Sequence, residues 1–383
     1  MDAGSEGSQV LRREEFPRLF SALEDAGYQV VGPTVRDGAI VYDRLHGVDD
    51  LPRGWTDRQG PGRYRLERRG DDALFGYNVG PFTWKKFLFP PRERLFTVQR
   101  EGGSFTVVPE PVEAPLTAFL GVRACELAGL AVTDRVFQGG PVVDPGYAAR
   151  RSRVLLVAVQ CGQAGGNCFC ASMRTGPSVS GGADLVLTEI LGPGPHRFLV
   201  RAGSPRGAEV LSPLNLPPAP EEDERTVGEL LDRTTRSMGR EMDPTGLRDL
   251  LRETLQHPRW EEVARRCLSC TNCTLVCPTC FCSTHEEVPD LSEEKVERWR
   301  RWDSCFNLGF TELHGAPVRA SGRSRYRQWL THKLGTWHDQ FGTSGCIGCG
   351  RCITWCPVGI DLTEEVAALR VPVAPAGPPG RPP

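Results

Sequence analysis

The chain has 383 residues, of which 39% are hydrophobic and 25% are charged, and its formal net charge is −2. This balance is typical of a globular protein, and the near-neutral charge excludes the strongly basic footprint of a nucleic-acid-binding protein. No stretch approaches the apolar length of a membrane span, and the acidic, Gly/Ser-rich start does not resemble a signal peptide. We therefore expect a cytoplasmic protein.

Arginine supplies nearly all of the positive charge. Only four of the 46 basic residues are lysine, namely Lys85, Lys86, Lys295 and Lys333. We attribute this bias to genomic base composition rather than to function.

The first part of the chain, residues 1–202, is predicted to be an α/β domain. Apolar residues recur at helical spacing over 13–26, which predicts an amphipathic helix. Three short apolar runs follow at 117–122, 153–159 and 184–190. Runs that are apolar on both faces are typical of strands in a covered sheet. The expected fold class of this domain is therefore α/β with a mixed sheet.

A Pro-rich segment that becomes acidic, residues 203–225, predicts a linker to a second domain. Beyond it, 226–241 and 245–266 are helical by their apolar period. The second of these helices leads directly into Cys267, the first residue of a cysteine-rich region.

Eight of the fifteen cysteines repeat one pattern. The two copies are Cys267-x2-Cys270-x2-Cys273-x3-Cys277-Pro278 and Cys346-x2-Cys349-x2-Cys352-x3-Cys356-Pro357. This is the bacterial ferredoxin run, whose fourth cysteine binds the other cluster. Zinc ribbons, the alternative, need neither the third closely spaced cysteine nor the Cys-Pro pair. We predict two [4Fe–4S] clusters with crossed ligation, one held by Cys267, Cys270, Cys273 and Cys356, and the other by Cys346, Cys349, Cys352 and Cys277.

A long insertion, 278–345, separates the two runs. Its sequence predicts mostly helix, at 292–302 and again at 324–341. Residues 226–370 are thus predicted to form a mostly α-helical domain built on a two-cluster ferredoxin-like fold. The Pro-rich tail at 371–383 is predicted to be disordered.

Four further cysteines, Cys125, Cys161, Cys168 and Cys170, lie in the α/β domain. Cys125 comes just after one predicted strand and Cys161 just after another, and ligands of α/β sheets bind beyond the carboxyl ends of strands. The four side chains could hold a third [4Fe–4S] cluster or a zinc ion. They could equally be one small buried residue and three loop thiols, and the sequence leaves these alternatives open.

Three cysteines remain, Cys280, Cys282 and Cys305. They could be ligands of another site, shared with His285, Asp303 or His314. They could also be free thiols buried near the first cluster, which is the interpretation we favour.

Several segments resemble one family, the beta subunits of cytoplasmic, NAD(P)-linked [NiFe] sulfhydrogenases, to which the electron-transfer subunit of anaerobic sulfite reductase is similar. The most specific are CPTCFC and WDSC, because ferredoxin runs alone occur in many redox proteins. The full set is 267–282, 301–307, 325–333 and 346–361, with GPFTWKKFLFPP, GVRACELAGL and CFCASMRTGP upstream. One departure is Glu126, where the family resemblance leads us to expect aspartate.

The resemblance implies an electron-transfer subunit that has no nickel, flavin or nicotinamide site of its own. Its partners would be a flavin/[2Fe–2S] subunit that oxidises NAD(P)H and the small and large subunits of a [NiFe] hydrogenase. No residue is assigned a catalytic role, and no nucleotide fingerprint is present. The alternatives are the equivalent subunit of a sulfite reductase, a subunit that itself reduces sulfur or polysulfide, and a zinc-dependent interaction module.

Overall fold

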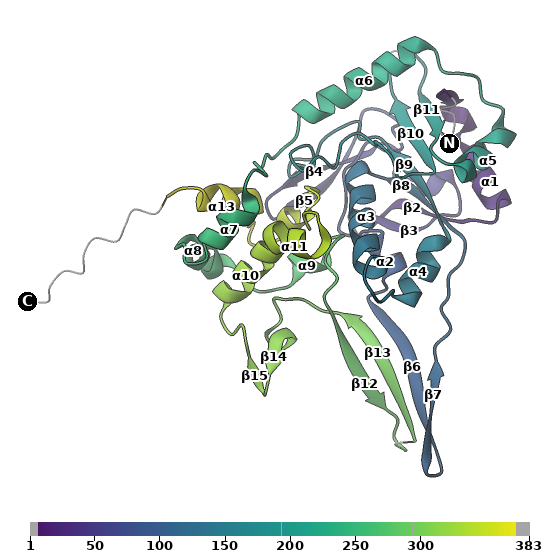
Figure 1. Cartoon of the computed structure of the whole chain (residues 1–383). Coiled ribbons are helices and arrows are strands. Elements are labelled where there is room, and N and C mark those ends of the chain that lie inside the picture. Colours follow the sequence, from purple (N-terminus) through teal and green to yellow (C-terminus); the bar gives the residue numbers. More distant parts are fainter. Residues whose placement is uncertain (1–6, 193, 293, 373–383) are drawn as a thin grey trace, which may run out of the picture.

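A seven-stranded mixed sheet forms the body of the N-terminal part (Figure 1). The computed structural model describes residues 7–192, 194–292 and 294–372. The strands lie in the order β1-β11-β10-β9-β8-β2-β3, and the central neighbours β2, β8, β9 and β10 run parallel. Their bounds are β1 Gln9–Arg12, β2 Gln29–Arg36, β3 Ala39–Arg44, β8 Thr117–Val122, β9 Val154–Val159, β10 Leu185–Ile190 and β11 Arg197–Ala202.

Both faces of this sheet are buried, which explains the uninterrupted apolar sequence of β9. Leu155, Val157 and Val159 belong to one core, whereas Val154, Leu156 and Ala158 belong to the other. Successive side chains of a strand point to opposite faces, so all six positions must be apolar. The first core is closed by α1 (Phe16–Asp25) and α5 (Pro205–Leu211), and the second by α2 (Lys85–Leu88), α3 (Ala124–Gln138) and α4 (Pro145–Ser152).

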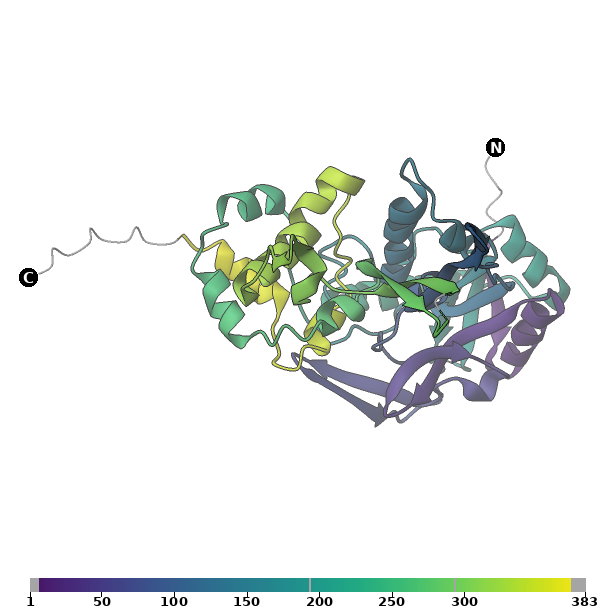
Figure 2. The same ribbon diagram turned by 90° about the horizontal axis from the view of Figure 1, so that it is seen from below.

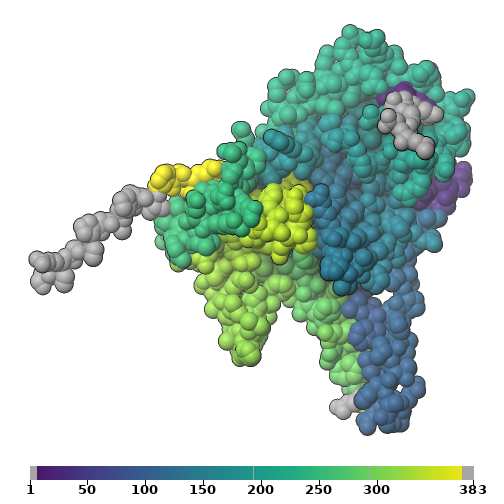
Figure 3. Space-filling view, in the orientation of Figure 1, coloured from purple at the N-terminus to yellow at the C-terminus, as the bar shows by residue number. Residues whose placement is uncertain are grey.

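A second sheet projects from the body as a narrow arm (Figures 1 and 3). Its order is β12-β13-β6-β7, all antiparallel, and it joins segments from both halves of the chain. The bounds are β6 Arg92–Glu101, β7 Ser104–Pro109, β12 Ser283–Pro289 and β13 Lys295–Trp302. Two shorter hairpins, β4 (Trp55–Gly60) with β5 (Arg63–Arg68) and β14 (Glu312–Leu313) with β15 (Ala316–Pro317), complete the strands.

The arm corrects the prediction of a helix over 292–302, because most of this segment is strand β13. Its charged residues face partners on neighbouring strands: Arg298 pairs with Glu287, Arg301 with Glu286, and Arg94 of β6 with Glu297. Opposite charges across strands stabilise a sheet. The second half of the insertion is helical, so the C-terminal part is a mixed structure rather than a mostly α-helical domain.

The remaining C-terminal helices lie beside the seven-stranded sheet rather than on top of it (Figure 2). They pack around a third core that includes Trp260, Tyr326 and Trp329, and several cysteines of both runs pack against it. The bounds are α7 Leu247–Glu253, α8 Arg259–Arg266, α9 Asn272–Leu275, α10 Gly322–Thr331, α11 Trp337–Phe341, α12 Arg351–Thr354 and α13 Leu362–Leu369, with a π-helical turn over His332–Thr336.

The segment predicted as a linker, 203–225, is largely helical. It contains α5 and the start of α6 (Glu221–Arg236). Ser204 accepts a hydrogen bond from Gly207 N and Pro205 stands in the first turn, both helix-start features. Val210 and Leu211 are buried against the sheet, so the segment is part of the first core.

The predicted disordered tail lies, apart from residues 371 and 372, outside the described residues. Among the helices of the described ranges, none is long and apolar enough to cross a membrane.

Candidate iron–sulfur centres

The two cysteine runs follow the same backbone path. Ser269 and Thr271 in the first run have φ values of 51° and 70°, and their counterparts Gly348 and Gly350 have 67° and 73°. Left-handed backbone is unfavourable for side chains other than glycine. Its occurrence at matching positions indicates that both loops are shaped by the same requirement.

That shape directs backbone N–H groups at cysteine sulfur atoms. Such bonds run from Ser269 N to Cys267 Sγ (3.4 Å), from Gly348 N to Cys346 Sγ (3.5 Å) and from Ile360 N to Cys356 Sγ (3.3 Å). Hydrogen bonds to cluster sulfurs tune reduction potential.

The first predicted set of four thiols surrounds one hollow. Cys267, Cys270, Cys273 and Cys356 all line it, so the fourth cysteine of the second run does join the first three of the other. Burial raises the pKa of Cys273 well above its usual range, and the nearby Cys267, Cys356 and Cys270 raise it further. Neutral thiols so placed lose protons when a metal binds.

Two buried polar atoms beside this hollow fit an acceptor group inside it. Tyr326 and Trp329 line the hollow and are 2% and 4% exposed. In the described structure, Tyr326 Oη and Trp329 Nε1 have no hydrogen-bond partner. Buried donors are rarely left unsatisfied, so a group with acceptor atoms, such as the sulfides of a cluster, fits this hollow.

The second predicted set is also brought together. Burial raises the pKa of Cys346 to about 12, and its neighbours include Cys349 and Cys277. Cys352 is likewise surrounded by Cys346, Cys349 and Cys277, and also by Cys273 of the first set. The two sites therefore adjoin each other.

The second run is packed directly on the N-terminal part, which requires its glycines. A Cβ atom at Gly348 would lie 2.6 Å from Phe169 O, and one at Gly350 would lie 2.2 Å from Asn167 O. Phe169 N donates to Gly348 O (2.8 Å). The loop that carries Cys168 and Cys170 is thereby held against the second set.

The third predicted set also meets at one hollow, which Cys125, Cys161, Cys168 and Cys170 line together with Arg123. Burial raises the pKa of Cys168 to about 12. It also raises that of Cys125, with added contributions from Cys170 and from Cys349 of the second set. Burial also raises the pKa of Cys161, and the guanidinium of Arg123, 2% exposed, only partly opposes this rise.

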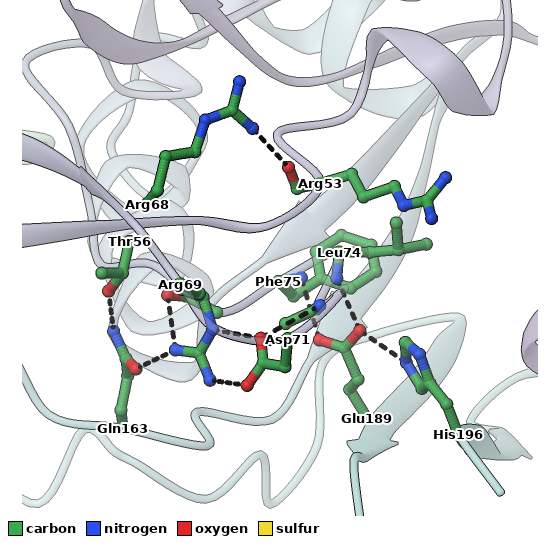
Figure 4. Close-up of polar contacts among 12 residues, drawn as sticks. Arg53, Thr56, Arg68, Arg69, Asp71, Leu74, Phe75, Gln163, Glu189 and His196 are labelled. Carbon is green, nitrogen blue, oxygen red and sulfur yellow. Dashed lines mark hydrogen bonds and ion pairs between the residues drawn. The ribbon is translucent and has the colours of Figure 1, made fainter.

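A polar network holds the wall of this third hollow (Figure 4). Arg69 donates to Gln163 Oε1 (2.7 Å) and Gly76 O (3.1 Å), and pairs with Asp71 (2.6 Å). Gln163 lies two residues after Cys161 and lines the hollow. In the same view, Glu189 accepts from the backbone of residues 74 and 75 (2.6 and 2.9 Å) and contacts His196 (2.9 Å).

A buried carboxylate, Glu126, connects the N-terminal part to the second cysteine run. It is 1% exposed and accepts hydrogen bonds from Tyr42 Oη (2.8 Å), Trp84 Nε1 (3.0 Å) and Arg123 N (3.1 Å). Arg351, inside the second run and 1% exposed, forms an ion pair with it. Sequence reasoning noted Glu126 only as a departure from the family and missed Arg351.

The last three cysteines lie close to Cys277 and to two buried lysines. Lys333 Nζ donates to Cys277 Sγ (3.4 Å), and Lys85 Nζ donates to the backbone oxygens of Cys277 (3.0 Å) and Cys280 (2.9 Å). Sequence reasoning missed both lysines. The sequence did contain a clue to them, namely the small number of lysines. The chain has only four lysines, and two of them lie beside these cysteines.

The cysteine side chains of these sets are spaced more widely than the ligands of a single metal ion. Within the described ranges, no three His, Cys, Asp or Glu side chains form a group suited to one metal ion. In a [4Fe–4S] cluster each thiolate binds a different iron, which requires a wider spacing than the single ion of a zinc site.

Comparison with known proteins agrees with the cysteine geometry. Residues 266–360 match the family model described as a 4Fe-4S dicluster domain. The chain is 29% identical over 368 residues to sulfhydrogenase 2 subunit beta of Pyrococcus furiosus, covering 94% of this chain and 97% of that protein. The chain is thus similar over nearly its whole length to a sulfhydrogenase beta subunit. No solved structure matches it significantly.

The predicted resemblance to these beta subunits is therefore confirmed, and so is the presence of [4Fe–4S] clusters as cofactors. The match extends through the N-terminal sheet as well as the cysteine runs, because it covers nearly the whole chain. The assignment of each cysteine to a particular cluster, and a third cluster, stay predictions.

Proposed function

We propose that the chain is an electron-transfer subunit of a multi-subunit oxidoreductase, relaying single electrons through [4Fe–4S] clusters. The observation that carries this proposal is the meeting of the two ferredoxin runs, each with its fourth cysteine beside the other three. Cys352 of the second set also lines the hollow of the first, so the two sites are neighbours. Cys349 of the second set lies next to Cys125 of the third set. The series of neighbouring sites therefore continues into the N-terminal part.

A bound [4Fe–4S] cluster supplies one-electron transfer, whereas hydride chemistry needs a nicotinamide or flavin. The chain itself supplies four thiolates for each of the two sites, aims backbone N–H groups at sulfurs of both, and encloses the first site in aromatic side chains. With every iron ligated by protein, such sites carry electrons and leave substrate chemistry to other subunits.

The first set lies at one end of the proposed electron path through the three sets. Cys270 is exposed, and the apolar residues Leu268 and Val358, which line the same hollow, are 63% and 39% exposed. Exposed apolar patches mark sites of protein–protein contact. We place the docking of one partner here, because the exposed Cys270 brings this cluster site to the surface.

For the partners, we propose a flavin/[2Fe–2S] subunit that oxidises NAD(P)H and the small and large subunits of a [NiFe] hydrogenase, all in the cytoplasm. The relative's name, a sulfhydrogenase subunit, favours the hydrogenase complex over the sulfite reductase one.

We further propose that the third set binds a [4Fe–4S] cluster. Replacing Cys168 and Cys170 together with serine is then expected to lower the iron content by about four per chain, because the two thiolates are half of the ligands. Iron and sulfide analysis of anaerobically purified protein makes the measurement. The same iron content in variant and parent would rule out the third cluster while leaving the other two intact.

The relay itself is tested by separating electron acceptance from nicotinamide oxidation. The isolated chain is expected to be bleached by dithionite, yet to leave NADPH and NADH unchanged, since it offers no hydride acceptor. Adding the flavin subunit should let NADPH or NADH reduce the clusters, followed by their visible absorbance. Oxidation of nicotinamide by the flavin-free chain would contradict the proposal.

A further inference from the structure

The second predicted set contains a buried positive charge, the ammonium group of Lys333. This residue is 3% exposed and lies in the π-helical turn His332–Thr336, directly after α10. Turns of this kind are rare and are frequently found at functional sites. The ring centroid of Trp337 lies 5.0 Å from Lys333 Nζ and covers one side of the group. The other contacts of the ammonium group are hydrogen bonds.

These hydrogen bonds show that the lysine carries its charge. Lys333 Nζ donates to Thr279 Oγ1 (3.0 Å), Gly345 O (3.2 Å) and Cys277 Sγ (3.4 Å). The Thr279 hydroxyl gives its own hydrogen to Gly345 O (2.5 Å), so it accepts the hydrogen from the lysine. Three acceptors require the three N–H donors of an ammonium group, since a neutral amine has only two.

Lys333 also joins the two segments that supply the second set. Cys277 is the fourth cysteine of the first run, and Gly345 comes directly before Cys346, the first cysteine of the second run. The backbone of Lys333 binds the same glycine, because Gly345 N donates to Lys333 O (2.8 Å). The side chain therefore lies where the two segments meet, and the sulfur of a predicted cluster ligand is one of its acceptors.

No carboxylate balances this charge within the described ranges. The contacts of Lys333 Nζ there are a hydroxyl, a carbonyl oxygen, a sulfur and an aromatic ring. A buried charge without an opposite charge is costly. A [4Fe–4S] cluster with four thiolate ligands has a net negative charge, so the occupied second set supplies the opposite charge that the lysine lacks.

The other buried cations near these sites are placed differently. Arg351 of the second run is paired with Glu126, so its charge is balanced. Lys85 donates to the backbone oxygens of Cys277 (3.0 Å) and Cys280 (2.9 Å). No charged side chain is among the described residues that line the hollow of the first set. An unbalanced cation beside a ligand sulfur therefore distinguishes the second ferredoxin-type site from the first.

We propose that Lys333 is the counter-cation of the second cluster and raises its reduction potential. One electron that enters this cluster adds a negative charge to the site. A cation in hydrogen-bond contact with a ligand sulfur stabilises this reduced form more than the oxidised one. An electron that enters at the exposed first set is thereby held in the middle of the three sets, away from the surface. The inference rests on the proposed function, because it assigns a preferred electron site within that relay.

The test is a redox titration of anaerobic holoprotein followed by electron paramagnetic resonance. The signal that is missing from Cys277→Ser identifies the cluster to be followed. The side chain in Lys333→Met has a similar length but neither charge nor donor. The ratio of reduced to oxidised cluster at a fixed potential should therefore fall about tenfold, a shift of about 59 mV to lower potential. Lys295→Met is the matched control and should leave the potential unchanged, because Lys295 lies on the arm at 39% side-chain exposure and pairs with Glu297.

A second neutral variant separates charge from hydrogen bonding. Lys333→Gln keeps N–H donors but carries no charge, and its signal should move in the same direction. Both variants should keep the iron content of the parent protein. An unshifted signal in both would overturn the proposal. Loss of about four irons from both would also overturn it, by showing that the lysine holds the ligand loops together rather than setting the potential.

The proposed relay is judged separately from this inference. A parent protein without iron, or without any signal that Cys277→Ser removes, contradicts the cluster assignment on which the relay is built. A full set of signals that the Lys333 variants leave unshifted contradicts only the role of the lysine.

Discussion

Replacing Cys277 with serine is expected to destroy the cluster of the second run, not the cluster of its own run. The reason is that Cys277 lies among Cys346, Cys349 and Cys352, whereas Cys356 lines the hollow of the first run. Loss of one of four thiolates removes a strong ligand, and we expect about four irons to be lost.

The sharpest form of this experiment starts from a chain whose first run is already disabled by Ala at 267, 270 and 273. This background should retain about four irons, or about eight with the third cluster. Adding Cys277→Ser should then remove about four of them, whereas adding Cys356→Ser should change nothing. The opposite pattern would show that each run ligates its own cluster. Cys305→Ser, also a cysteine of the insertion and outside both sets, is the matched control and should keep the iron content of the background.

Replacing Glu126 with alanine is expected to destabilise the whole molecule. The change leaves the guanidinium of Arg351 buried without its partner and removes the acceptor of Tyr42 and Trp84. Breaking a buried ion pair from one side costs about 3–5 kcal/mol. For a protein of this size we expect the apparent unfolding temperature to fall by on the order of 10 °C, measured by calorimetry on anaerobic holoprotein.

An exposed ion pair supplies the control. Arg58 and Glu67 pair across the β4–β5 hairpin at 78% and 41% side-chain exposure, and such pairs contribute about 0–1 kcal/mol. Glu67→Ala should therefore leave the unfolding temperature nearly unchanged. The double variant Glu126→Leu with Arg351→Met should recover part of the loss, since it leaves no unpaired charge. Equal effects of Glu126→Ala and Glu67→Ala would show that the buried network contributes little.

The features that could be predicted from the sequence are those with a local cause. The cysteine spacing of each ferredoxin run is set by one short loop around one cluster. Each run can therefore be recognised in the sequence without knowledge of any distant contact. In the same way, six consecutive apolar residues in β9 reflect burial on both faces.

The features that could not be predicted depend on partners far along the chain. The segment of β13 has the charge and length of a surface helix, but its register is decided by β6, some two hundred positions earlier. The role of Glu126 depends on Tyr42, Trp84 and Arg351, which contact it only in the folded chain.

The measurement that tests the account most directly is a reductive titration of the anaerobically purified chain with iron, sulfide and electron paramagnetic resonance analysis. We predict about eight irons and eight sulfides per chain, or about twelve of each with the third cluster, and one unpaired electron for every four irons after reduction by dithionite. A colourless protein that contains zinc and no acid-labile sulfide would contradict the account.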